Sequence, residues 1–124
     1  MRGQKNSAER LPDWLFVVIT KALLGEVYPA IRAIAVRYSP EENTLLLRAY
    51  LDREPTEDDN ENIAIIETNI FAMTTRAEIA SSQAECVHTN APHGRLDPLD
   101  GFVFARSEIA PGVPYLEGPY SWSD

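Results

Sequence analysis

The residues that could most readily form a metal site or a catalytic site are the carboxylates of segment 52–61. This segment holds six acidic side chains and one arginine in ten residues. Clustered carboxylates can bind calcium or act as general acid and base. An EF-hand loop beginning at Asp52 would need Gly at its sixth position and Glu at its twelfth, where this chain has Glu57 and Ile63. A loop beginning at Asp58 fails in the same way. A glycosidase pair would need an apolar pocket to raise the pKa of one acid, and nothing in the segment indicates such a pocket.

Cys86, His88 and His93 are the other side chains that could ligate a metal or act as nucleophile and base. Their C-x-H-x4-H spacing lacks the paired pattern of zinc sites, so we expect no metal and no other cofactor. A small hydrolase that uses Cys86 and His88, in a pocket near His93 and Asp97, stays open as an alternative. Strand alternation favours a buried cysteine and a rim histidine instead, and we therefore expect a protein without catalytic residues.

The charge of the chain indicates what it could bind. The formal net charge is −8, and only two of the eleven basic residues are lysines. Binding to nucleic acid or to an anionic membrane rests on Lys and Arg side chains, so neither is expected as a partner. A partner with a basic surface is the natural expectation.

Acidic side chains are concentrated in residues 41–61, which carry eight acids and two arginines. Negative charge in the first turn of a helix is stabilising, which explains the acids at 57–59 but not those before and after them. We therefore predict that this segment docks on a basic protein, with Arg48 and Tyr50 as anchors on an open sheet face. The predicted partner-binding residues are Glu41, Glu42, Arg48, Tyr50, Asp52, Glu54, Glu57, Asp58, Asp59 and Glu61.

The elements that must position these residues can be predicted from periodicity. An apolar stripe predicts a helix at about 12–24, with Gly25 just after its end. Alternation predicts a β-hairpin over 32–52, with its arginines on an accessible face. Thr56 and Asp59 resemble a capping box, and the stripe Ile63, Ile66, Ile70 and Met73 predicts the helix that follows. Residues 84–89 and 101–107 are β-like.

The resulting order, α-β-β-α-β-β, predicts an α+β two-layer sandwich. Short connections favour an antiparallel sheet of about four strands with both helices on one face. We expect a flexible start (1–10), a single domain (11–108) and a Pro/Gly-rich tail (109–124). The single cysteine and the lack of a long apolar run favour a cytoplasmic protein.

Three stretches resemble small bacterial immunity proteins of contact-dependent growth-inhibition and similar polymorphic toxin loci. They are "LLGEVYPAIRAIAV", "LLLRAYLDREPTEDDNENI" and "LDPLDGFVFARSE", and the resemblance covers about residues 11–108. It implies a non-enzymatic cytoplasmic protein that binds and neutralises a cognate toxin domain, often a basic nuclease. It supplies no catalytic residues. The alternatives are the small hydrolase above and a structural or regulatory homo-oligomeric protein; a monomer or a weak homo-oligomer is expected.

Overall fold

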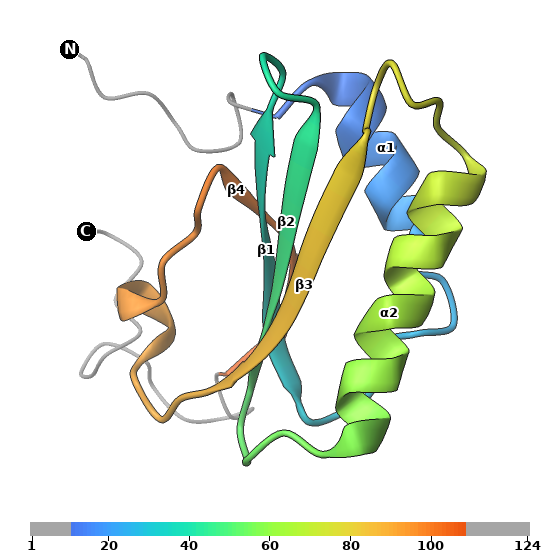
Figure 1. Ribbon diagram of the computed structural model, residues 1–124. Helices are drawn as coiled ribbons and strands as arrows, with labels where there is room; N and C mark the ends of the chain where they lie inside the picture. Colours follow the sequence, from blue (N-terminus) through green and yellow to red (C-terminus); the bar gives the residue numbers. More distant parts are fainter. Residues whose placement is uncertain (1–10, 109–124) are drawn as a thin grey trace, which may run out of the picture.

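A computed structural model of the chain describes residues 11–108 (Figure 1). Its elements follow the predicted order α-β-β-α-β-β. They are α1 (Asp13–Ala22), β1 (Ile31–Ser39), β2 (Thr44–Leu51), α2 (Glu57–Ala72), β3 (Ser81–His88), the short 3-10 helix η2 (His93–Arg95) and β4 (Gly101–Ala105). The predicted flexible start (1–10) and tail (109–124) lie outside the described residues, and the domain limits stay a prediction.

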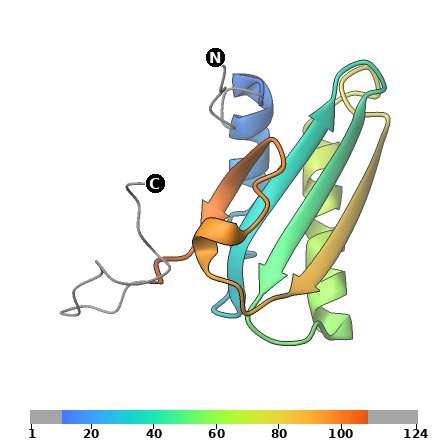
Figure 2. The same cartoon turned by 90° about the vertical axis from the view of Figure 1, so that its left-hand side faces the viewer.

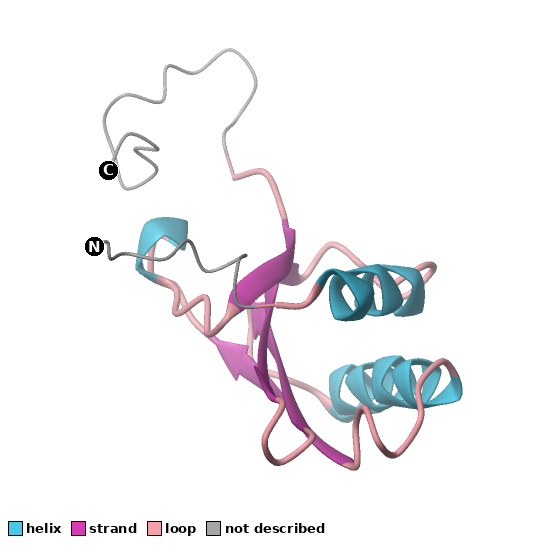
Figure 3. Ribbon diagram, turned by 90° about the horizontal axis from the view of Figure 1, so that it is seen from above, coloured by secondary structure: helices cyan, strands magenta, loops and turns pink. Residues whose placement is uncertain are grey.

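The α+β two-layer class is confirmed. The four strands form one sheet in the order β3-β2-β1-β4, and both helices lie on the same face of it (Figure 3). The expectation of a wholly antiparallel sheet was wrong for one pair, since β3 lies parallel to β2. The reason is the connection: α2 carries the chain back along the sheet, and such a β-α-β crossover places its two strands in parallel.

The β1–β2 hairpin is antiparallel and closes at the pair Ser39 and Thr44. Asn43 in the turn has a φ of 55°, a left-handed conformation that asparagine tolerates better than most residues. At the other end of β1 the register shifts between Ile31 and Ala33. As a result of this bulge, Ile31 lies in the main core together with Ile34 and Val36, although regular alternation would put Ile31 and Ile34 on opposite faces.

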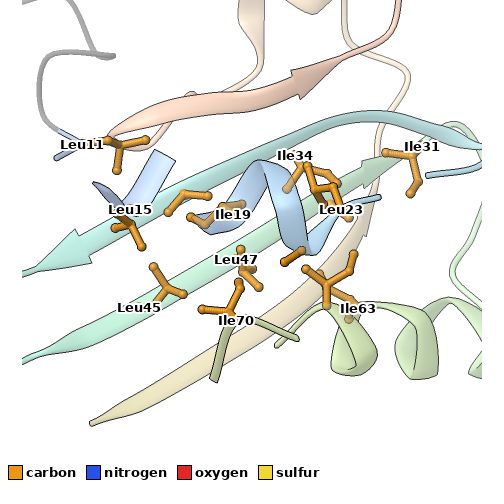
Figure 4. Close-up of a cluster of buried hydrophobic side chains, with 14 of the residues drawn as sticks. Leu11, Leu15, Ile19, Leu23, Ile31, Ile34, Leu45, Leu47, Ile63 and Ile70 are labelled. Carbon is orange, nitrogen blue, oxygen red and sulfur yellow. The ribbon is translucent and has the colours of Figure 1, made fainter. Parts of the chain in front are cut away.

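The main core lies between the sheet and the two helices (Figure 4). Leu15 and Ile19 of α1 are fully buried there, and Leu47 of β2 lies opposite them. The predicted stripe of α2 is confirmed for its isoleucines, Ile63, Ile66 and Ile70. Met73 is 40% exposed instead, because α2 ends at Ala72 and Met73 has already left the helical conformation.

The other face of the sheet is partly covered by the β3–β4 connection, residues 89–100 (Figure 2). Leu96 and Leu99 of this connection are buried against Ala33, Ala35 and Tyr50 in a second, smaller cluster. The uncovered part of this face lies toward the hairpin turn. Among the described residues, no helix is long and apolar enough to cross a membrane.

Candidate partner-binding site

The segment 52–61 lies where β2 ends and α2 begins (Figure 1). Thr56 is the N-cap of α2, and its hydroxyl accepts a hydrogen bond from the backbone N–H of Asp59 at 3.3 Å. In return, Oδ2 of Asp59 accepts from the backbone N–H of Thr56 at 2.7 Å. The predicted capping box is confirmed, and it fixes the direction in which the acidic first turn projects.

Asp59 is a structural residue within this acidic segment. Its side chain is 2% exposed, and it accepts hydrogen bonds from the Tyr28 hydroxyl at 2.5 Å and from Nη1 of Arg53 at 2.5 Å. The Arg53 guanidinium holds the pKa of Asp59 well below its usual range. Burial, followed by the Asp59 carboxylate, raises the pKa of Tyr28. The Asp59 carboxylate therefore already has partners inside the protein. The prediction that Asp59 belongs to an exposed docking surface was wrong.

Asp52 and Glu54 are exposed, but each has an intramolecular partner. Oδ2 of Asp52 accepts a hydrogen bond from Nη1 of Arg106 at 2.8 Å, and this contact lowers the pKa of Asp52. A carboxylate oxygen of Glu54 lies 3.1 Å from Nδ1 of His88, while the side chain of Glu54 remains 85% exposed. These two acids serve the fold as well as the surface.

Glu57, Asp58 and Glu61 are exposed on the first two turns of α2. Within residues 11–108, none of the three takes part in an ion pair or a side-chain hydrogen bond. Like Glu41 and Glu42, these three acids carry a charge that no neighbour neutralises within the described residues.

Glu41 and Glu42 are exposed in the turn that precedes β2, whereas segment 52–61 follows β2. An eight-residue strand at ~3.3 Å per residue separates the two groups by roughly 25 Å. The structure therefore does not bring the ten predicted residues together in one patch. It places two groups of acids at opposite ends of the molecule.

Tyr50 lies beneath the β3–β4 connection, and the side chain of Arg48 beside it is 23% exposed. Tyr50 is 5% exposed, and its hydroxyl donates to the backbone oxygen of Asp97 at 2.9 Å. Arg48 donates from Nη1 to the Tyr50 hydroxyl at 3.2 Å and from Nε to Glu85 at 2.5 Å. The expectation of an exposed Tyr50 was wrong because residues 89–100 cover this part of the sheet.

A buried ion pair near the same end of the sheet was not foreseen. Arg32 is 4% exposed, and its Nε and Nη2 donate to the two carboxylate oxygens of Glu108, both at 2.7 Å. Its Nη1 also donates to the backbone oxygen of Thr89 at 3.0 Å. The alternating pattern of the sequence predicted that Arg32 lies on an accessible face. Its burial depends on the bulge beside it and on a partner 76 residues away, and neither can be recognised from the neighbouring residues in the sequence.

The groups of the alternative hydrolase are dispersed. Sγ of Cys86 contacts the backbone oxygen of Asp59 at 3.6 Å, and burial raises the pKa of this thiol to about 11. A thiol with that pKa is almost entirely protonated at neutral pH and is a poor nucleophile. His88 faces Glu54, while His93 is buried beside Phe102 with ring centroids 5.2 Å apart. Across residues 11–108, no three His, Cys, Asp or Glu side chains meet in a way that could hold a metal ion.

Comparison with known proteins adds one finding to this geometry. The model of a protein family described as MafI2 immunity protein matches residues 12–108, which includes every described helix and strand. No curated protein matches the chain.

Proposed function

The chain belongs to the MafI2 immunity protein family, and from this premise we propose that it binds a cognate toxin domain and neutralises it without catalysing a reaction. Family membership supports the toxin-immunity role. The high pKa of Cys86 and the separation of His88 from His93 support a binding protein rather than a hydrolase. A single cysteine makes no demand for an oxidising compartment, which supports action in the cytoplasm.

The proposal that the toxin is bound through an acidic surface rests on the uncompensated charge of Glu57, Asp58 and Glu61. These acids project from the start of α2, next to the largely exposed Glu54. An acidic surface of this kind attracts a basic partner and raises the rate of productive encounters. Nucleases are basic where they bind the phosphates of their substrate, so a nuclease domain is the toxin class we propose.

The proposed contact surface is narrower than the set predicted from the sequence. It comprises Glu54, Glu57, Asp58 and Glu61, which lie close together at one end of the molecule. Asp52 borders this surface but is engaged with Arg106. Asp59 supports it from inside, and Arg48, Tyr50, Glu41 and Glu42 lie outside it.

Two charge-matched variants test this surface. Asp58→Lys with Glu61→Lys reverses two acids on the proposed surface, whereas Asp13→Lys with Glu41→Lys reverses two exposed acids elsewhere. Each pair raises the net charge by four and includes one acid from the first turn of a helix, so that loss of helix-dipole stabilisation is matched. We expect the first variant to weaken toxin binding by at least about tenfold, and the second to stay near wild type.

The probe is the toxin domain encoded beside the gene for this chain, since an immunity gene normally follows its toxin gene directly. Binding is measured by calorimetry, and protection is measured as growth of cells that produce the toxin. Far-ultraviolet circular dichroism checks that both variants are folded. Unchanged binding and protection in a folded Asp58→Lys, Glu61→Lys variant would refute the acidic surface, and failure of the wild-type chain to bind and protect would refute the immunity function.

A homo-oligomeric binding protein is the second candidate, because α1 exposes large apolar side chains. Phe16 is 42% exposed, Val17 is 48% exposed, and Leu24 just after the helix is 76% exposed. Apolar side chains of this size are common at the centres of interfaces. Light scattering of the wild-type chain over a hundredfold range of concentration would show an increase in mass if this surface drives self-association.

A further inference from the structure

Within residues 11–108, no strand pairs with the outer edge of β3. β3 is an end strand of the sheet, and its eight residues contain no proline, glycine or lysine. Natural proteins usually protect exposed edges with such residues, with bulges, or by keeping the edge strand short. β4, the other edge in the described part of the chain, is only five residues long. β3 is therefore the longer edge of this sheet, its pairing with β2 has no bulge, and Glu85 is its only acidic residue.

The hydrogen-bonding groups that this edge offers can be identified. The backbone N–H of Thr89 donates to the backbone oxygen of Leu51 of β2 at 3.1 Å, and the backbone N–H of Ser81 donates to that of Asn43, just before β2, at 3.4 Å. Backbone groups of a strand in a parallel ladder alternate in direction, so odd-numbered residues of β3 face β2 and even-numbered residues face outward. The outward residues are Ser82, Ala84, Cys86 and His88.

Acidic and aromatic side chains lie on the helix side of this edge. Glu67 of α2 accepts a hydrogen bond from the Ser82 hydroxyl, which places Glu67 directly over the edge. Phe71 follows Glu67 by one helical turn on the same flank of α2 and is 41% exposed. Glu54 lies against His88 at the far end of the strand. A strand added here would meet Phe71 and Glu67 near the start of β3 and Glu54 near its end.

A pocket of about 450 Å³ lies beside the first half of β3. Arg37, Leu46 and Gln83 are register partners across β1, β2 and β3, and they form one row of its lining. Glu42 lines the same pocket. In strand addition, main-chain hydrogen bonds supply affinity and a neighbouring pocket for alternate side chains supplies specificity. The edge and the pocket together have both features.

Resting on the proposed function, we propose that the toxin adds a strand to the free edge of β3, and that this strand carries basic side chains with at least one apolar residue among them. Charge argues for this occupant over a second copy of the chain. Two copies paired through β3 would each bring a net charge of −8 and a Glu67 side chain over the shared edge. Like charges across an interface oppose association, whereas a basic strand is attracted by the same acids.

Amide hydrogen exchange measured by NMR tests the proposal with an internal control. The full chain is compared alone and in complex with the toxin domain encoded beside its gene. We expect the amides of Ser82, Ala84, Cys86 and His88 to exchange at least about tenfold more slowly in the complex. The amides of Gln83, Glu85 and Val87 face β2 already and should change little.

A pair of variants at one position provides a second readout. Ala84→Pro removes an outward-facing donor without removing a bond to β2, and proline is tolerated on edge strands in this orientation. Ala84→Ser keeps the donor and is the control. We expect Ala84→Pro to weaken toxin binding by at least about tenfold and Ala84→Ser to leave it within about twofold; if Ala84→Pro does not fold, the exchange experiment on the wild-type chain decides.

The outcomes separate this inference from the proposed function. Tight toxin binding with no slowing at the four outward amides would overturn the strand-addition site and leave the immunity function intact. Absence of binding and of protection would overturn the immunity function as well. Slow exchange at these amides in the chain alone, with a dimer mass by light scattering, would show that a second copy occupies the edge and would overturn the toxin strand.

Discussion

At the scale of single residues, Asp59 shows how one carboxylate of an acidic segment can serve the fold rather than a partner. It caps α2, pairs with Arg53 and accepts the hydroxyl hydrogen of Tyr28. Its immediate neighbours Glu57 and Asp58 make no comparable contact among the described residues. The sequence predicted the capping role from the spacing of Thr56 and Asp59. It could not predict the contact with Tyr28, which lies 31 residues away.

We predict that Asp59→Asn destabilises the protein at neutral pH by roughly 2–4 kcal/mol, because the variant weakens the charge-assisted hydrogen bonds that the buried carboxylate accepts from Arg53, Tyr28 and the backbone of Thr56. The pKa of Asp59 is lowered in the folded chain, chiefly by Arg53. Its contribution to stability is therefore complete above the ordinary aspartate pKa of about 3.9 and is lost as the pH falls from there through the lower pKa of the folded state.

Urea unfolding of the wild type and of Asp59→Asn at several pH values from 7 down to 2 measures this contribution. The difference in free energy of unfolding should be largest at neutral pH and should shrink below about pH 4. Asp58→Asn makes the same chemical change at an exposed position and should alter the stability by less than about 1 kcal/mol. A difference between wild type and Asp59→Asn that stays constant over this pH range would contradict the assignment.

At the scale of elements, the chain was most predictable where local signals and burial agreed. The cap at Thr56 and the stripe Ile63, Ile66 and Ile70 identified α2, and alternation identified the β1–β2 hairpin. The parallel pairing of β3 with β2 depends on where α2 returns the chain, which no local pattern records.

Two irregularities show the same limit on prediction. Phe102 and Phe104 share a face in a regular strand, but a register shift in the β1–β4 pair places Phe104 against the main core and Phe102 against the second cluster. The burial of Tyr50 depends on the path of residues 89–100, which carry two prolines and a 3-10 turn instead of a periodic pattern. The face on which a strand residue lies could thus be assigned from the sequence only where the strand is regular and is covered by segments close to it in the sequence.

The buried pair Arg32–Glu108 joins β1 to the segment after β4, and we predict strong coupling between the two side chains. Arg32→Met and Glu108→Gln should each lower the free energy of unfolding by roughly 3–5 kcal/mol, because each removes the two charge-assisted hydrogen bonds that join the buried side chains. The double variant should be much more stable than the sum of the two losses implies.

A double-mutant cycle followed by urea unfolding measures this coupling. The pair Arg48–Glu85 is the control, since its side chains are 23% and 42% exposed compared with 5% and 7% for Arg32 and Glu108. A more exposed pair is screened by water and should show a coupling below about 1 kcal/mol. Equal coupling energies for the two pairs would contradict the prediction.

At the scale of the whole molecule, the arrangement of charge matters more than its total. α1 and α2 run in opposite directions, so the acidic first turn of α2 lies at the opposite end from Asp13 and from the turn that holds Glu41 (Figure 1). At an ionic strength of 0.15 M, charges are screened over a Debye length of about 8 Å, well below the roughly 25 Å that separates the two ends. Each end therefore presents its own field to an approaching partner.

This separation predicts how salt affects association with the toxin. Stopped-flow measurements on the wild type should show an association rate that falls by about tenfold or more between 0.05 M and 0.5 M salt, with a smaller change in the dissociation rate. Asp58→Lys with Glu61→Lys should slow association at low salt and flatten its salt dependence. Asp13→Lys with Glu41→Lys should retain the wild-type profile, although both variants shift the net charge from −8 to −4. Equal slowing by the two variants would show that total charge steers the encounter, and that the acids at the start of α2 have no special part in it.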